Sequence, residues 1–144
     1  MEIKKTLKQE REGAMKLVWN VFSEFEAPDY VDEGINTFRS FITSEDELNG
    51  LEIYSAYEKE NIVGVIATRN QGNHIALFFV DKKHHRQGIG RKLFEVALKN
   101  STSGVITVNS SPYAKEVYHK LGFSDTDVEQ TTDGLRYIPM RYEK

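Results

Sequence analysis

The chain has 144 residues, of which 39% are hydrophobic and 11% aromatic, and this length and composition suit a single domain over residues 1–144 with one core. The net charge of −3 at pH 7 offers no broadly basic surface, which argues against nucleic-acid binding. The chain has no cysteine, so disulfide frameworks, thiolate metal sites and cysteine nucleophiles are excluded. It shows neither the apolar core of a signal peptide nor a stretch of membrane-spanning length, so we expect a cytoplasmic protein that makes no membrane contact.

The first half of the chain predicts two amphipathic helices placed between strands. Apolar residues recur at helical spacing in both helices, and Asp29 is expected to cap the second one. The alternating pattern of residues 51–58 is typical of a strand. The expected elements are a strand at 2–7, helices at 10–25 and 31–42, and strands at 51–58 and 62–68.

The second half begins with a hairpin turn at residues 70–73, because Asn-Gln-Gly-Asn between two apolar runs favours a tight reversal. Gly122 stands where a glycine commonly ends a helix. The expected elements are strands at 74–80 and 105–109, helices at 88–100 and 111–121, and a final strand pair at 123–130 and 135–142. Together, seven strands and four helices predict an α+β domain in which the helices pack on a mixed sheet.

The most informative segment is a basic glycine turn at residues 85–92, which reads His-Arg-Gln-Gly-Ile-Gly-Arg-Lys. It connects the apolar strand 75–80 to the helix that starts near Ile89. Glycine lets a ligand approach the backbone, and a helix start carries unpaired N–H groups and the positive end of the helix dipole. The segment therefore predicts an anion site, and a phosphate is the usual anion at such a site.

Two common nucleotide-binding motifs do not fit this turn. A dinucleotide fingerprint needs a third glycine where Leu93 stands, and an acidic residue at the end of the next strand, where Val108 and Asn109 stand. A P-loop needs Gly-Lys followed by Ser or Thr, which is absent. These motifs therefore leave open which phosphate-containing ligand the turn binds.

A second informative segment follows one helix and one strand later, at residues 117–123 (Val-Tyr-His-Lys-Leu-Gly-Phe). Tyr118 lies on the apolar face of its predicted helix together with Val117 and Leu121. A tyrosine in that position is either a core residue whose hydroxyl reaches the rim or a functional group, and the spacing does not separate the two.

The two segments together resemble the GNAT superfamily of acyl-CoA-dependent N-acetyltransferases. That family opens the helix after its central strand with Gln/Arg-x-x-Gly-x-Gly/Ala, which here reads His85 to Gly90. The segment 117–123 resembles the family's later motif, which ends in Tyr-x-Lys-x-Gly-Phe. The resemblance covers essentially the whole chain. It implies the acyl-CoA N-acyltransferase fold, a mixed, mostly antiparallel twisted sheet of about seven strands flanked by four helices.

The resemblance also implies acetyl-CoA as the co-substrate, without a metal. Tyr118 would be the catalytic acid that protonates the departing thiolate, which is chemically reasonable because the reference pKa of a thiol is about 8.5 and that of tyrosine about 10. Two departures stand out: His85 replaces the family's Gln or Arg, and Ser111 replaces a common asparagine. The implied cofactor-binding residues are Phe78, Phe79, Val80, His85, Arg86, Gln87, Gly88, Ile89, Gly90, Arg91, Asn109 and Ser111.

The acceptor side has one hint in residues 23–33, which hold five acidic residues and no basic one. This acidity is either a solvated helix end or the rim of a cleft for a cationic amine such as a polyamine, a lysine-like group or an aminoglycoside. The candidate substrate residues are Phe25, Glu26, Asp29 and Tyr30. For the base that deprotonates the amine, the alternatives are Glu24, Glu26, Asp29, His74 or a chain of water molecules.

We therefore expect an N-acetyltransferase that moves an acetyl group directly from acetyl-CoA to a primary amine of a small molecule or peptide. The partners expected are acetyl-CoA and that amine, and the sequence leaves a homodimer open. Residues with metal-ligand spacing are missing, because His84 and His85 are adjacent in a loop and His119 stands alone. The alternative is a non-catalytic acyl-CoA-binding regulatory module, from which turnover would distinguish an enzyme.

Overall fold

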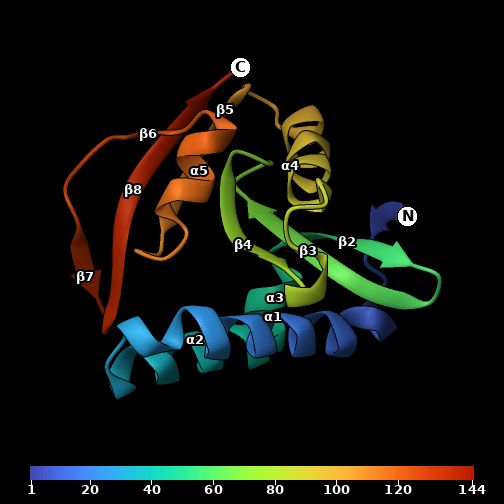
Figure 1. Cartoon of the computed structure of the whole chain (residues 1–144), viewed down its shortest axis with the longest axis horizontal. Helices are drawn as coiled ribbons and strands as arrows, with labels where there is room; N and C mark the ends of the chain where they lie inside the picture. The colour runs from blue at the N-terminus through green and yellow to red at the C-terminus, as the bar shows by residue number, and fades with distance from the viewer.

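A mixed sheet of eight strands forms the centre of the computed structural model, which describes residues 1–144 (Figure 1). The strands are β1 (Glu2–Lys5), β2 (Glu52–Glu58), β3 (Asn61–Arg69), β4 (His74–Val80), β5 (Val105–Ser110), β6 (Ser124–Asp125), β7 (Gln130–Thr132) and β8 (Leu135–Glu143). Their order in the sheet is β1-β2-β3-β4-β5-β8-β6, and β7 pairs with β8. Only β4 and β5 run parallel; every other pair is antiparallel.

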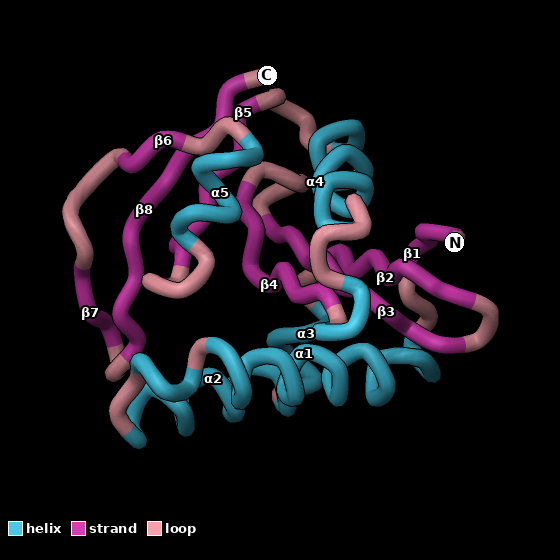
Figure 2. Tube along the Cα trace, in the orientation of Figure 1, coloured by secondary structure: helices cyan, strands magenta, loops and turns pink.

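Five α-helices cover the two faces of this sheet, with α1 to α3 on one face and α4 and α5 on the other (Figures 1 and 2). They are α1 (Arg11–Phe25), α2 (Asp32–Thr43), α3 (Glu45–Asn49), α4 (Ile89–Asn100) and α5 (Lys115–Leu121). Three short 3-10 turns add Lys8–Glu10, Ala27–Asp29 and Lys82–His84. None of the helices combines the length and the apolar character needed to cross a bilayer.

Each face of the sheet has its own hydrophobic cluster of 14 buried residues. In the α1 cluster, Val18 and Phe22 are almost fully buried, and the Phe22 ring stacks on Phe38 of α2 with 3.9 Å between ring centroids. In the α4 cluster, Leu93 of α4 lies with Ile106 of β5 and Met140 of β8, and all three are nearly inaccessible to solvent. Each such buried side chain contributes about 1.5–3 kcal/mol, so the two faces together hold the sheet between the helices.

The expected fold class is confirmed: an α+β domain with a mixed, mostly antiparallel sheet. Two details differ from the expected seven strands and four helices. The extra helix is α3, which buries only Leu48. Ser44 caps its start, because the Ser44 Oγ accepts a hydrogen bond from the Glu47 N–H at 3.2 Å. The expected strand 123–130 divides into β6 and β7, and only those two short parts pair with β8.

Two helix starts also differ from expectation. Val31, not Asp29, precedes α2, because Asp29 ends the 3-10 turn after α1. The expected helix 111–121 begins at Lys115, since the Ser111 Oγ accepts from the Ala114 N–H at 3.1 Å and holds residues 111–114 in a turn. Both expected helix starts rested on local capping residues. Such residues also form side-chain turns, so they do not by themselves locate the first residue of a helix.

The parallel contact between β4 and β5 is short, and this shortness shapes the rest of the molecule. The two strands pair only at His74 with Thr107 and at Ile75 with Val108. Beyond them β5 continues to pair with β8 as far as Ser110, while β4 continues along β3 to Val80. The remainder of β4, residues 76–80, therefore has one edge without a neighbouring strand.

Two glycines in helices α1 and α2 test the packing of the fold. A Cβ on Gly34 would overlap the backbone carbonyl of Gly134 in the β7–β8 turn, whereas a Cβ on Gly13 would meet nothing closer than Ile62 Cδ1 at 3.8 Å. We expect Gly13→Ala to raise the free energy of unfolding by about 0.5–1 kcal/mol through helix propensity. Gly34→Ala is expected to lower it by about 2 kcal/mol or more, because α2 and the hairpin must separate. Urea denaturation of both variants measures the difference, and equal effects would contradict this close packing.

Candidate active site

The free edge of β4 presents two backbone N–H and C=O pairs that the sheet does not use. Antiparallel strands alternate between pairs that exchange hydrogen bonds and pairs that do not. The Asp81 N–H donates to the Val63 carbonyl at 2.8 Å, so the next pair along the ladder, Val80 with Gly64, turns its polar groups outward. By the same alternation Phe78 turns outward and Phe79 bonds to β3. Of the three residues 78–80, Phe78 and Val80 therefore offer backbone partners to a ligand.

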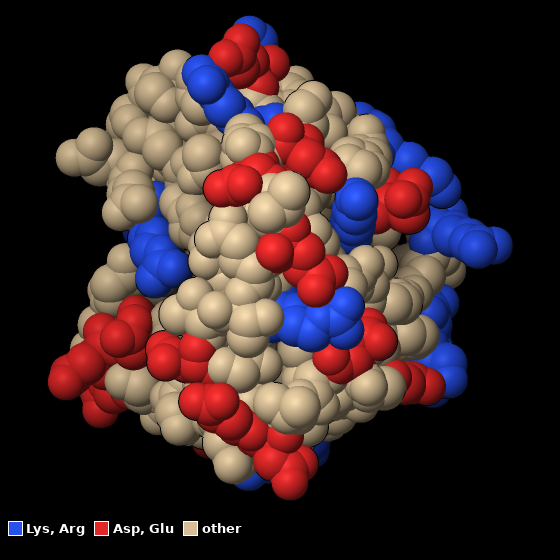
Figure 3. Space-filling view, turned by 90° about the vertical axis from the view of Figure 1, so that its left-hand side faces the viewer, with Lys and Arg blue, Asp and Glu red and all other residues tan.

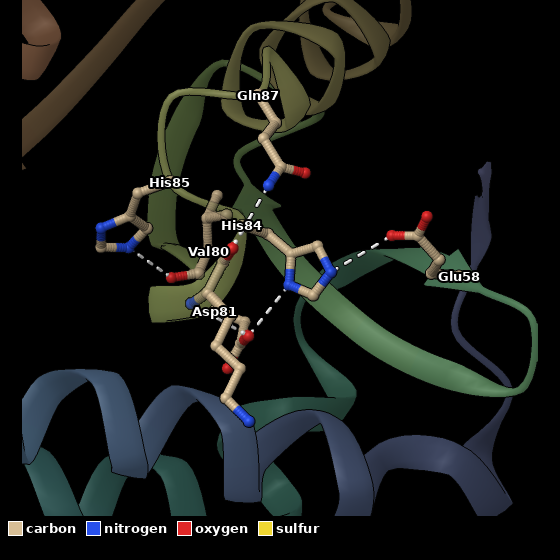
Figure 4. A network of polar contacts seen from close by, with 7 residues as sticks. Glu58, Val80, Asp81, His84, His85 and Gln87 are labelled. Atoms are coloured by element: carbon tan, nitrogen blue, oxygen red, sulfur yellow. Dashed lines mark hydrogen bonds and ion pairs between the residues drawn. The ribbon is translucent and has the colours of Figure 1, made fainter.

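The loop that follows β4 is fixed by three side-chain contacts, drawn in part in Figure 4. His84 lies between two carboxylates, with Nδ1 at 2.9 Å from Asp81 Oδ2 and Nε2 at 3.2 Å from Glu58 Oε2. Lys82 Nζ lies 2.7 Å from Glu24 Oε1 on α1. Both nitrogens of His84 donate to their carboxylates only when the imidazole is protonated, and the loop is then tied to β2.

His85 points away from His84 and toward the free edge of β4 (Figure 4). Its Nε2 lies 2.8 Å from the Val80 carbonyl oxygen, so that nitrogen carries the proton and donates. The imidazole also packs against the Phe25 ring, with 5.4 Å between centroids. In this structure His85 therefore holds the start of the loop against β4.

The start of α4 leaves three backbone donors free. The first hydrogen bond inside the helix runs from the Lys92 N–H to the Gly88 carbonyl at 3.1 Å, so the N–H groups of Ile89, Gly90 and Arg91 have no acceptor in the helix. Gly88 has a φ of +80°, a left-handed conformation in which a side chain is strained. The positive end of the helix dipole adds to these donors and makes the turn suitable for a phosphate.

Two pockets share lining residues at the free edge of β4. The first, which we call the CoA-side pocket after the co-substrate that the resemblance implies, has a volume of about 450 Å³ and reaches the glycine turn. The second, the acceptor cleft, has a volume of about 380 Å³ and runs between β4 and the α2 and β8 walls. The residues that line both are Glu26, Phe78, Phe79, Ala114 and Tyr118. A ligand in one pocket thus meets a ligand in the other at these five residues.

Tyr118 occupies this junction from α5. Its ring packs edge-on against Phe78 and Phe123, with centroid distances of 5.9 and 5.3 Å, and only 5% of the residue is exposed. Burial, and secondarily the negative charge of Glu26, raise the pKa of its hydroxyl well above the usual range. Tyr118 therefore stays protonated at neutral pH and can give up its proton only to a strong base formed beside it.

Glu26 is the only charged residue among the five at the junction. Burial raises the pKa of its carboxyl to about 7, and nearby Asp29 adds to the rise, while a hydrogen bond from Ser111 opposes it. A carboxyl with this pKa exchanges its proton near neutral pH, which is the property that general acid–base chemistry requires.

The remaining candidate residues of the acidic segment are spread apart. Glu24 forms the ion pair with Lys82, and neither Asp29 nor Phe25 lines either of these two pockets. Tyr30 does line the acceptor cleft, and its hydroxyl donates to the Arg136 carbonyl at 3.2 Å. Figure 3 shows the acidic side chains in several separate groups with basic side chains between them. The segment 23–33 therefore contributes Glu26 and Tyr30 to the cleft wall and not a continuous acidic rim.

The other predicted cofactor residues divide between the two pockets. His85, Arg86 and Gly90 line the CoA-side pocket together with Val80. Gln87 and Arg91 are exposed beside it; Gln87 Nε2 donates to the Lys83 carbonyl at 3.2 Å, and Ile89 is buried against the sheet. Asn109 and Ser111, by contrast, line the acceptor cleft and not the CoA-side pocket.

Sequence reasoning missed the far wall of the acceptor cleft. That wall comes from Phe38 and Phe41 of α2 and from the β8 residues Leu135 and Tyr137. Nothing local marks these residues, because α2 and β8 meet only through the fold; the one sequence signal is the pair of small residues Gly34 and Gly134 at their contact. The structure contains no group of three or more His, Cys, Asp or Glu side chains placed to hold a metal ion.

The raised pKa of Glu26 predicts a pH-dependent cost to stability. The Glu26 carboxyl has a folded-state pKa of about 7 and an ordinary unfolded-state pKa of about 4.5. The folded protein therefore loses stability as the pH rises from about 4.5 through 7. We expect Glu26→Gln to raise the free energy of unfolding by up to about 3 kcal/mol at pH 8 and to change it little at pH 4.5. Thermal unfolding at both pH values is the measurement, with Glu24→Gln as the control; an equal shift at both would contradict the raised pKa.

Comparison with known proteins places this geometry in a family. The sequence profile of the Acetyltransferase (GNAT) domain matches residues 26–144. A UPF0039 protein of Schizosaccharomyces pombe (strain 972 / ATCC 24843) is 30% identical over 84 residues, which are 55% of this chain and 56% of that protein. The match thus spans about half the length of this curated relative.

Solved structures share the fold over nearly the whole chain. A GCN5-related N-acetyltransferase from Rhodopseudomonas palustris superposes with a TM-score of 0.86 at 18% identity, covering 99% of this chain and 95% of the other. PaiA N-acetyltransferase from Thermoplasma acidophilum, solved with coenzyme A, gives 0.78 at 17% identity and covers 99% and 98%. Aminoglycoside 6'-N-acetyltransferase from Enterococcus faecium gives 0.67 at 15% identity and covers 98% and 96%. Likeness at these identities establishes the fold, and the profile match over residues 26–144 establishes the family: the chain belongs to the GNAT acetyltransferases.

Proposed function

We propose that this protein transfers an acetyl group directly from acetyl-CoA to a primary amine. The observation that carries this proposal is the meeting of two pockets at Tyr118 and Glu26, beside the free edge of β4. Direct transfer needs the thioester and the amine in contact at one point, with an acid and a base within reach. A junction with one titratable hydroxyl and one titratable carboxyl supplies this arrangement.

Acetyl-CoA fits the CoA-side pocket in one direction. Its pyrophosphate would bind the free N–H groups of Ile89, Gly90 and Arg91, with Arg86 adding positive charge nearby. Its pantetheine would add to the free edge of β4 as a strand does, using the outward N–H and C=O of Phe78 and the N–H of Val80, whose carbonyl already accepts from His85. This direction brings the thioester to Phe78, where an outward N–H can stabilise the developing oxyanion.

Tyr118 would act as the acid for the departing thiolate. The amine nitrogen forms a bond with the thioester carbon, the carbon–sulfur bond breaks, and the sulfur receives a proton from the Tyr118 hydroxyl. The hydroxyl then recovers a proton from the nitrogen of the new amide. Because Tyr118 is buried, the thiolate forms in the same dry environment, and the transfer is favoured over release of a free anion.

The solved neighbours support this proposal by what their names state. The PaiA structure contains coenzyme A, and the Enterococcus faecium protein is an aminoglycoside 6'-N-acetyltransferase. The alternative, a non-catalytic acyl-CoA-binding regulatory module, would use the CoA-side pocket alone. It gives no reason for a second pocket of about 380 Å³ that shares a buried tyrosine and a half-buried carboxyl with the first.

The first test removes the Tyr118 hydroxyl. We expect Tyr118→Phe to lower kcat by about 100-fold, the usual effect of losing a general acid, and to leave acetyl-CoA affinity unchanged. Stability should not fall, because the ring contacts with Phe78 and Phe123 remain. Free-thiol release with an amine acceptor measures kcat, and calorimetric titration measures the affinity.

Tyr142→Phe is the matched control, since the Tyr142 ring also packs on Phe123, at 5.5 Å, but lines neither pocket. The control should keep wild-type kcat. Wild-type kcat in Tyr118→Phe would remove Tyr118 from the acid role, and acetyl-CoA binding without turnover by the wild type would favour the regulatory module.

The second test fills the phosphate turn. A Cβ on Gly90 would make only ordinary contacts, at 3.7 Å, with Phe78 and Val80, so the larger side chain of Gly90→Val extends into the CoA-side pocket. We expect its acetyl-CoA Kd to rise at least tenfold while the unfolding midpoint changes by only a few degrees. Gly13→Val, on the exposed face of α1, is the control for introducing valine into a helix. Unchanged affinity in Gly90→Val would place the coenzyme elsewhere.

A further inference from the structure

The acceptor cleft restricts the chemistry of the amine, and this inference rests on the proposed function. We propose that the acceptor is a monoamine with an apolar body about the size of a substituted ring, and that Glu26 receives its ammonium group and takes its proton. The argument uses the charge at the junction, the walls of the cleft and the charges at its rim.

At the junction, Glu26 is the one group able to attract an ammonium ion. The other four residues that line both pockets are Phe78, Phe79, Ala114 and Tyr118, none of them charged at neutral pH. No Lys or Arg lies within ion-pair distance of Glu26, whereas its neighbour Glu24 is paired with Lys82 at 2.7 Å. An ammonium group that enters this junction therefore has one carboxylate to approach.

Behind the junction, apolar and aromatic side chains form about half of the cleft wall. The neutral polar side chains beside them are Thr37, His74, Asn109, Ser111 and Thr132. Phe22 and Phe38 stack on each other at 3.9 Å, and Phe22 also stacks on Tyr30 at 5.7 Å. The apolar and aromatic residues of the walls are Phe22, Tyr30, Phe38, Phe41, Ile75, Ala76, Leu77, Val108, Leu135 and Tyr137. A dry cavity of about 150 Å³ can hold benzene, so a cleft of about 380 Å³ can take a ring with a short side chain.

The charges of the cleft lie at its rim and are mixed in sign. Glu47, Arg69 and Asp133 are exposed, and Arg136 forms an ion pair with Glu129 at 3.0 Å. A second ammonium group placed among the phenylalanines would lose its hydration without gaining a buried carboxylate. The cleft therefore discriminates against polyamines and aminoglycosides, which the acidic sequence of residues 23–33 had suggested.

Several titratable groups surround Glu26 and set its charge. Asp29 on the same connection raises its pKa, and Tyr30 and Tyr118 are neutral hydroxyls beside it. On the coenzyme side, the basic groups that line the pocket are His84, His85, Arg86 and Lys120. Bound coenzyme phosphates would pair with Arg86 and Lys120 and so reduce the positive charge that competes with the ammonium group for the Glu26 carboxylate.

The protons balance with Glu26 as the base. The ammonium group gives one proton to the Glu26 carboxylate and becomes the free amine that attacks the thioester. The second proton leaves the nitrogen as the amide forms and reaches the sulfur by way of Tyr118. Glu26 returns its proton to solvent, so one turnover makes an amide and a thiol and releases one proton.

The experiment compares four amine acceptors at fixed acetyl-CoA, with free-thiol release as the readout: 2-phenylethylamine, ethanolamine, 1,4-diaminobutane and kanamycin. We expect kcat/KM for 2-phenylethylamine to exceed that of each of the others at least tenfold. A diamine or kanamycin that equals or exceeds it would overturn the proposal while leaving the acetyltransferase function intact. Acetyl-CoA binding with no turnover of any amine would overturn the proposed function itself.

Two variants test whether Glu26 is the base that deprotonates the amine. With 2-phenylethylamine at pH 7, Glu26→Gln should lower kcat/KM at least 100-fold and leave acetyl-CoA affinity unchanged. The wild-type rate should level off above pH 7, whereas the rate of the variant should keep rising toward the pKa of the amine, because only the neutral amine can then react. The variant should be far less impaired with an amine that is already neutral at pH 7, such as methoxyamine, because no proton has to be removed before attack. Glu12→Gln, on the exposed face of α1 and outside both pockets, should behave as the wild type. An unchanged pH profile in Glu26→Gln, or equal losses with both amines, would overturn the base role.

Discussion

The early end of the β4–β5 ladder is the constraint on which the rest of this structure depends. Two residue pairs join these strands, and beyond Ile75 their backbones diverge. The divergence costs the hydrogen bonds of residues 76–80 on one side, and unpaired polar groups of this kind persist only where a partner or solvent satisfies them. His85 already satisfies the Val80 carbonyl. The same separation opens the sheet for two pockets and leaves Tyr118 and Glu26 between them.

The helices on either side of the sheet turn this opening into a site with two different chemical environments. On one side, the glycine turn and the start of α4 supply backbone donors and nearby positive charge, which suit a polyanionic coenzyme. On the other side, the stacked rings of α1 and α2 give an apolar cleft. Because a low-dielectric environment strengthens each electrostatic interaction inside it, the single carboxyl at the boundary has a large influence on what binds and reacts there.

Much of the fold could be predicted from local pattern. The amphipathic spacing of α1 and the alternation of β2 located these elements within a residue or two, because one side of each must be buried. Prediction was weakest where burial is slight: α3 buries only Leu48, and β6 has both residues exposed. It also failed at Asp29 and Ser111, where side chains that cap helices form turns equally well.

By itself, the sequence determined the class of fold and predicted an anion site at residues 85–92, because glycine positions and helical spacing are local properties. Tyr118 became the candidate acid through the resemblance to the GNAT family, since its spacing alone fits a core tyrosine equally well. Only the tertiary structure decided which of the acidic residues 23–33 reaches the junction. These residues are equivalent by composition, yet Glu24 turns to Lys82 while Glu26 lies between the pockets. The acceptor cleft was likewise decided by the fold, since its walls come from α1, α2, β4 and β8. Their contact depends on how helices pack across the sheet, which no short stretch of residues encodes.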